Sequence, residues 1–169
     1  MAEADRSLKT FFATLAAAVM FVYYTSKSLP GVVASHFNSL GVATGFLPRQ
    51  IYVPVMLGVV LLPPIFLVLI PRLALRNPNA RINVPHRDYW LAPERRQQTV
   101  EIISQQSTHF AVMLVLFLCY SHWMVVHANS SSPPSLSSGW LLAGLVVFMG
   151  LTVRWATRLI ARFRVIEEE

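Results

Sequence analysis

Long uncharged runs of apolar residues dominate the pattern of this chain. The clearest is Ile51–Ile70, which carries no charge and lies between Arg49 and Arg72. At a rise of 1.5 Å per residue, a helix of about 20 residues is about 30 Å long and matches the hydrocarbon core of a bilayer. Three further spans are predicted at about 10–26, 109–127 and 139–154. The pattern predicts an all-α polytopic membrane protein, one domain over residues 1–169, with four transmembrane helices in a bundle.

The first apolar run has a competing interpretation. It follows Arg6 and Lys9, and basic residues before an apolar run are also typical of a secretory signal. No cleavage site of small residues follows promptly, and the run ends in Tyr23 and Tyr24, which suit a membrane interface. We interpret residues 10–26 as an uncleaved first span.

The segments between the spans differ in character. Prolines and glycines in 27–50 predict a compact irregular loop, with one short helical turn near Val33–Asn38. A long loop is predicted between the second and third spans, over 71–108. No helix breaker follows Pro93 until Ser130, so one helix is expected from about 93 to about 127, its first half outside the bilayer. Pro63 and Pro64 predict a kink within the second span.

Composition supports a membrane protein and argues against a nucleic-acid-binding protein. Hydrophobic residues make up 54% of the chain and charged residues 13%, against about a quarter charged in soluble domains. The net charge of +6 raises nucleic acid as a partner, but the placement of the basic residues has a simpler explanation in membrane topology. The lipid bilayer is therefore the predicted partner, and no nucleic acid is expected. The single Cys119 excludes an intrachain disulfide.

The basic residues also predict an orientation. Twelve of the 14 Lys and Arg residues lie in the N-terminal segment, in the 71–108 loop and after residue 153. Four spans place these three segments on one side of the membrane. Because cytoplasmic segments are enriched in Lys and Arg, both termini and the long loop are predicted to be cytoplasmic. Asn38 is then outside and Arg95 inside.

Two basic regions on that side are candidate interaction surfaces. The segment Asn83–Arg96 mixes aromatic residues with charges of both signs, which fits an interfacial anchor or a docking surface for a cytoplasmic protein. The docking candidates in it are Tyr89, Trp90, Arg95 and Arg96. After residue 153, basic residues at a spacing of four lie on one helical face and suit anionic lipid headgroups. They are Arg154, Arg158 and Arg162.

The chain shows no motif for enzymatic chemistry. It contains no P-loop, HExxH, GxSxG, CxxC or GxGxxG pattern, so we expect no cofactor and no metal site. A membrane enzyme would have to rely on Asp88, Glu94 and Glu101 in the long loop. Three interpretations of His122 stay open: an interfacial residue, a relay or cavity residue, or a hydrogen bond within the bundle.

The first loop resembles a known family. Over about residues 13–60 the chain is similar to the N-terminal domain of the bacterial Sdp immunity protein, the SdpI-like family. The positions that carry the resemblance are Leu29, Pro30, His36, Phe37, Asn38, Gly41 and Gly45. The family usually has an acidic or polar residue between the two glycines, where this chain has Val42-Ala43-Thr44. The segment 89–96, YWLAPERR, also resembles part of some relatives.

The resemblance implies a small multi-pass protein of the bacterial inner membrane. It implies a non-enzymatic role in sensing or immunity, with His36, Phe37, Asn38 and Gly41 as an outer recognition element. From the residues alone, His36 and Asn38 also fit a loop cap. A small transporter, or an accessory subunit of a transport complex, is the alternative, because a kink at Pro63-Pro64 can open a cavity at the bilayer midplane. The sequence leaves a cytoplasmic protein partner and a homodimer open.

Overall fold

Four long helices make up most of the chain. In the computed structural model, which describes residues 2–74, 77 and 82–164, they are α1 (Ala2–Thr25), α2 (Arg49–Ala74), α4 (Arg96–Ala128) and α5 (Ser138–Arg164). Each is long and apolar enough to cross a membrane, so the predicted number of spans is confirmed. The chain is a multi-pass membrane protein. Arg76, Arg81 and residues 165–169 lie outside the described residues.

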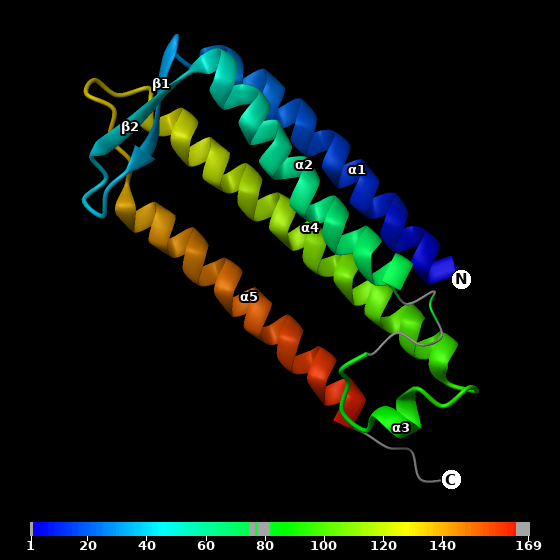
Figure 1. Ribbon diagram of the computed structural model, residues 1–169. Coiled ribbons are helices and arrows are strands. Elements are labelled where there is room, and N and C mark those ends of the chain that lie inside the picture. The colour runs from blue at the N-terminus through cyan, green and yellow to red at the C-terminus, as the bar shows by residue number, and fades with distance from the viewer. Residues whose placement is uncertain (1, 75–76, 78–81, 165–169) are drawn as a thin grey trace.

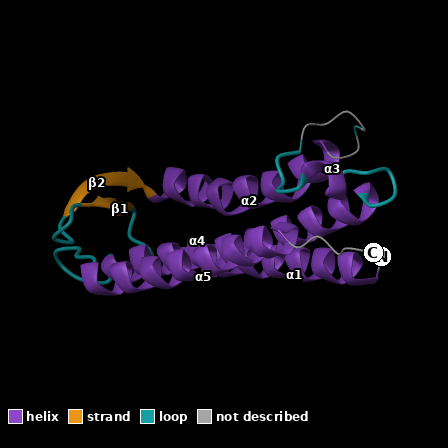
Figure 2. Cartoon of the chain, turned by 90° about the horizontal axis from the view of Figure 1, so that it is seen from below, coloured by secondary structure: helices purple, strands orange, loops and turns teal. Residues whose placement is uncertain are grey.

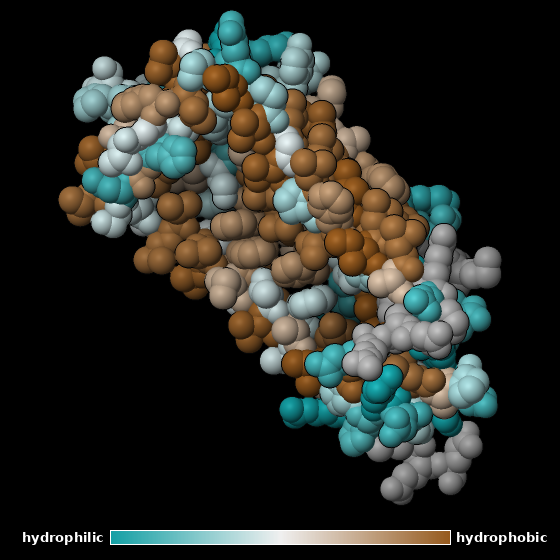
Figure 3. Space-filling model, viewed as in Figure 1, coloured by the Kyte–Doolittle hydropathy of each residue, from teal (hydrophilic) through white to brown (hydrophobic). Residues whose placement is uncertain are grey.

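The short elements lie at the two ends of the helices (Figure 1). The 3-10 turn η1 (Ser26–Ser28) and strands β1 (Val32–Phe37) and β2 (Ala43–Pro48) form one end, which we call the hairpin end. The short helix α3 (Arg87–Trp90) lies at the other, the arginine end, next to the end of α5; the start of α1 is at the same end of the bundle. Apolar side chains dominate the middle of the face shown in Figure 3, and polar side chains gather toward its two ends, mixed with apolar ones at the hairpin end.

Three of the helices form the core. Its main cluster combines Phe11, Leu15 and Val22 of α1 with Val60 of α2 and Val115 of α4. Small residues at the contact, such as Ala18 and Ala111, let the helix backbones approach closely, as is usual between transmembrane helices. No described residue of α5 belongs to this cluster. Among the described residues of α5 only Phe163 is buried, and this helix lies along α4 (Figures 1 and 2).

The prediction for the first loop was wrong. Residues 32–48 form an antiparallel hairpin, with Val33 opposite Leu47 and Ala34 opposite Phe46, and not an irregular loop with a helical turn. The physical reason is burial of Val33 and Ala34 of β1: Val33 packs with Leu29 and Tyr52, and a β-branched side chain favours the extended backbone. The fold is therefore mostly helical rather than strictly all-α.

Helix α1 begins at Ala2, before the predicted start of the first span near residue 10, and the boundaries of α4 and α5 change less. Helix α4 begins at Arg96 and runs without a break to Ala128, close to the predicted helix from about 93 to about 127. Helix α2 continues through Pro63 and Pro64 as one element, and Pro64 is buried. The helix after residue 153 continues the fourth span to Arg164, as the spacing of its arginines predicts.

Candidate functional site

At the hairpin end, the four predicted recognition residues have different surroundings. The side-chain oxygen of Asn38 accepts hydrogen bonds from the backbone N–H groups of Leu40 (3.0 Å) and Val42 (2.9 Å), so Asn38 holds the turn. Phe37 packs against the cluster around Met124. His36 is exposed, with its Nδ1 3.0 Å from the hydroxyl of Ser35. Asn38 is thus a loop cap, and His36 is the member of the set that is free to meet a ligand.

Gly41 connects the hairpin to the segment before α5. Its φ of 79° is a left-handed conformation that favours glycine, and its carbonyl accepts a hydrogen bond from the backbone N–H of Leu136 (2.9 Å). An added Cβ would lie 2.0 Å from the carbonyl oxygen of Leu136. One turn further, the hydroxyl of Ser138 donates to the carbonyl of Ser39 (3.0 Å). The hairpin is therefore fastened to the first turn of α5.

Sequence reasoning missed Asn129, which follows α4. Its side-chain oxygen accepts from the N–H of Ala34 (2.8 Å), and its side-chain nitrogen donates to the carbonyl of Ala34 (3.0 Å). This amide satisfies one position on the outer edge of β1 as a neighbouring strand would. The two residues are far apart in the chain, and nothing local in the sequence signals the contact.

At the arginine end, the predicted docking residues mostly contact other parts of the chain. The indole N–H of Trp90 donates to the carbonyl of Phe163 (2.9 Å), and the two rings meet edge-on at 5.2 Å. The guanidinium of Arg95 lies 4.2 Å from the centre of the Tyr89 ring. Arg96 donates to the carbonyl of Asn77 (2.7 Å). Trp90 thus ties α3 to the last turn of α5.

Exposed charge remains beside these contacts. Arg87 and Asp88 of α3 are exposed, whereas Tyr89, Trp90, Arg95 and Arg96 are half-buried. A partner that docks here would meet Arg87 and Asp88 first. The predicted docking residues are therefore less exposed than the two charged residues just before them.

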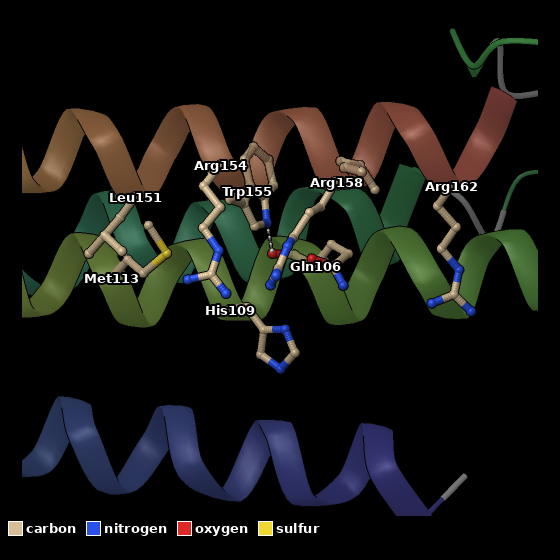
Figure 4. Close-up of a pocket in the computed structure, with 9 residues that line it drawn as sticks. Gln106, His109, Met113, Leu151, Arg154, Trp155, Arg158 and Arg162 are labelled. Atoms are coloured by element: carbon tan, nitrogen blue, oxygen red, sulfur yellow. Dashed lines mark hydrogen bonds between the residues drawn. The ribbon is translucent and has the colours of Figure 1, made fainter.

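The predicted lipid-headgroup residues share one side of α5. Arg154, Arg158 and Arg162 all extend across α4 and toward the side of His109 (Figure 4). Between them, the indole N–H of Trp155 donates to the carbonyl of Gln106 (3.1 Å). The helical spacing read from the sequence therefore does place the three guanidinium groups in a row on one side of α5.

His122 is a fully buried polar side chain. It has no exposed surface, and its two ring nitrogens lie 2.9 Å from the Tyr52 hydroxyl and 2.9 Å from the Thr25 hydroxyl. Because the Thr25 hydroxyl donates its single proton to the carbonyl of Phe21 (2.6 Å), it accepts from Nε2–H of His122. Nδ1 then accepts from Tyr52. A hydrogen bond within the bundle is confirmed, with partners at the hairpin ends of α1 and α2.

Among the described residues, no group of three or more His, Cys, Asp or Glu side chains could hold a metal ion. No family model, curated protein or solved structure matches this chain.

Proposed function

We propose that this chain is a non-enzymatic membrane protein of sensing or immunity type, similar to the SdpI-like family, in the bacterial cytoplasmic membrane. The hairpin would bind a ligand outside the cell, and the α3 segment would bind a cytoplasmic protein. The observation that carries the proposal is the attachment of α5. It contacts the hairpin through Ser138 at one end and α3 through Phe163 at the other.

The packing of α5 would allow this helix to shift along α4. A ligand can shift a protein only between states that it binds differently, and the element that shifts must be free to move at low cost. Among its described residues α5 buries only Phe163, so sliding along α4 disturbs little of the core. A ligand that displaces the Gly41–Leu136 contact would move the start of α5, and its end would then disturb the contact with Trp90.

The orientation is part of the proposal. Both termini and the arginine end would be cytoplasmic. Single cysteines at Leu40, which is 82% exposed, and at the exposed Asp88 test it in a Cys119→Ser background. A membrane-impermeant maleimide added to intact cells should label position 40 and spare position 88. Labelling of both positions from the same side would contradict the topology.

The ligand surface is testable at His36. Its ring is exposed and lies near further exposed apolar side chains of the hairpin, including Val42 and Phe46. His36→Ala should abolish a response to an external ligand while the amount of protein in the membrane stays normal. Thr44→Ala, at an exposed position on β2, is the matched control. An unchanged response in His36→Ala would remove the hairpin from the proposal.

The coupling through α5 is testable without knowing the ligand. Spin labels at positions 98 on α4 and 160 on α5 report the distance between the two helices. Gly41→Val breaks the contact with Leu136 and should widen or shift the distance distribution. Gly31→Val should not, because the Cβ position at Gly31 has no atom within 4 Å. Equal distributions in the two variants would exclude α5 as the connecting element.

A further inference from the structure

The contact between α4 and α5 leaves two adjoining cavities open. One, of about 400 Å³, lies near the arginine end, and the other, of about 380 Å³, lies toward the hairpin end. Met113 of α4 and Leu151 of α5 line both cavities. The two cavities therefore form one continuous groove, which we call the α4–α5 groove.

The half near the arginine end is basic. Its lining includes Arg154, Arg158, Arg162 and His109, together with Gln106, and no described carboxylate (Figure 4). Like charges spaced four apart on a helix repel one another, so three arginines on one face gain from an anion placed between them. Arginine is also suited to phosphate, because its fork of N–H donors matches the phosphate oxygens.

The other half is apolar. Leu116, Phe117 and Val147 are among its lining residues, and the rings of Phe117 and Phe148 stack at 4.4 Å beside it. Along α5 it extends from Leu151 to Trp140, which is about 16 Å at the rise of a helix. That length is about half of the 30 Å hydrocarbon core, and the apolar half ends near the hairpin end of α5.

The basic half lies level with Arg72, the residue that ends the uncharged run of α2. The guanidinium of Arg72 on α2 donates to the hydroxyl of Thr108, and Trp155 on α5 donates to the carbonyl of Gln106. Arg72, Thr108 and Trp155 are thus at one level across the bundle. Arginine and tryptophan at one level are typical of the boundary between hydrocarbon and headgroups. Lipid phosphates are therefore within reach of the three arginines.

We propose that the α4–α5 groove binds one anionic phospholipid of the surrounding bilayer. Its phosphate lies among Arg154, Arg158 and Arg162, and one acyl chain runs along the apolar half toward Trp140. The lipid fills the space that α5 leaves open against α4. This site is independent of a ligand at the hairpin.

Native mass spectrometry of the full chain in detergent tests the proposal. The probes are phosphatidylglycerol and phosphatidylcholine with identical acyl chains. One phosphatidylglycerol molecule should be retained per chain, with a preference of at least about tenfold, because each basic residue near an anionic lipid contributes about fivefold. The double variant Arg154→Gln/Arg158→Gln should lose the preference. Arg164→Gln, on the same helix end but outside the groove lining, should keep it.

The acyl-chain half has its own variant. Ala143 lines the apolar half, and Ala143→Phe should block it and release the lipid, as should the smaller Ala143→Leu. Val146→Phe, at a position that is 61% exposed and outside the lining, is the control. Melting temperatures equal to that of the wild type show that each compared variant is folded.

Three results would overturn the proposal. Equal retention of the two lipids would show only general contact with the bilayer. A lipid that stays bound in the folded Ala143 variants would exclude the acyl-chain half. Displacement of the lipid by excess soluble glycerophosphoglycerol would show a phosphate site that does not need the lipid.

Discussion

Helices α4 and α5 are neighbours of similar hydropathy but are held in different ways. Helix α4 packs with α1 and α2 and buries nine residues, including His122 and Thr108. Helix α5 buries one among its described residues and is attached through a few specific contacts, such as the bond from the Tyr120 hydroxyl to the carbonyl of Trp140 (2.5 Å). In a membrane both arrangements satisfy the hydrophobic requirement, because lipid covers whatever the protein does not. The bundle therefore consists of a packed core, α1, α2 and α4, and of one helix, α5, that can shift.

The largest effect should come from the buried polar group of the core. His122→Ala leaves a cavity and removes the partner of the Tyr52 hydroxyl, which we expect to lower the free energy of unfolding by about 2–4 kcal/mol. Thermal unfolding in detergent measures it. His127→Ala, an exposed histidine one turn further along α4, should change stability by less than about 0.5 kcal/mol. Similar effects of the two substitutions would contradict the division into core and surface.

An intermediate effect should come from the attachment of the hairpin. Asn129→Ala removes both hydrogen bonds to the backbone of Ala34, and we expect a loss of about 1–3 kcal/mol, confined to the hairpin end. Hydrogen exchange of the Ala34 amide should become faster, while amides of α2 stay protected. Ser130→Ala, at the exposed neighbouring residue, serves as the control. If Ala34 kept its protection, Asn129 would not be what holds β1.

The smallest effect on stability should come from α5. An added Cβ at Gly144 would lie 2.1 Å from the Tyr120 ring, so Gly144→Val should push α5 away from α4. Because α5 contributes little to the core, we expect the free energy of unfolding to fall by less than about 1 kcal/mol, while the distance between spin labels on α4 and α5 increases. Gly150→Val, where nothing lies within 4 Å of the added Cβ, should change neither measurement. A large loss of stability in Gly144→Val would show that α5 belongs to the core.

Parts of the candidate sites were accessible from local pattern alone. The spacing of Arg154, Arg158 and Arg162 predicts one helical face, and the structure places all three along one groove. Asn38 was a candidate cap because an asparagine side chain reaches backbone groups two residues further along. By contrast, the roles of Trp90 and His122 depend on Phe163, Thr25 and Tyr52, which lie far away in the chain. Tryptophan and histidine fit several environments, and only the distant contact residues determine which environment each has.

The sequence by itself determined the four membrane spans and the long helix through α4. These follow from the length of each apolar run and the absence of breakers, which are properties of neighbouring residues. Only the tertiary structure decided that 32–48 is a hairpin and that α5 stands apart from the core. The hairpin depends on contacts of β1 with distant residues, such as Val33 with Tyr52 and Ala34 with Asn129, and the place of α5 depends on which helices pack into the core. A hydropathy pattern records whether a residue avoids water, and in a membrane lipid and protein satisfy that requirement equally well.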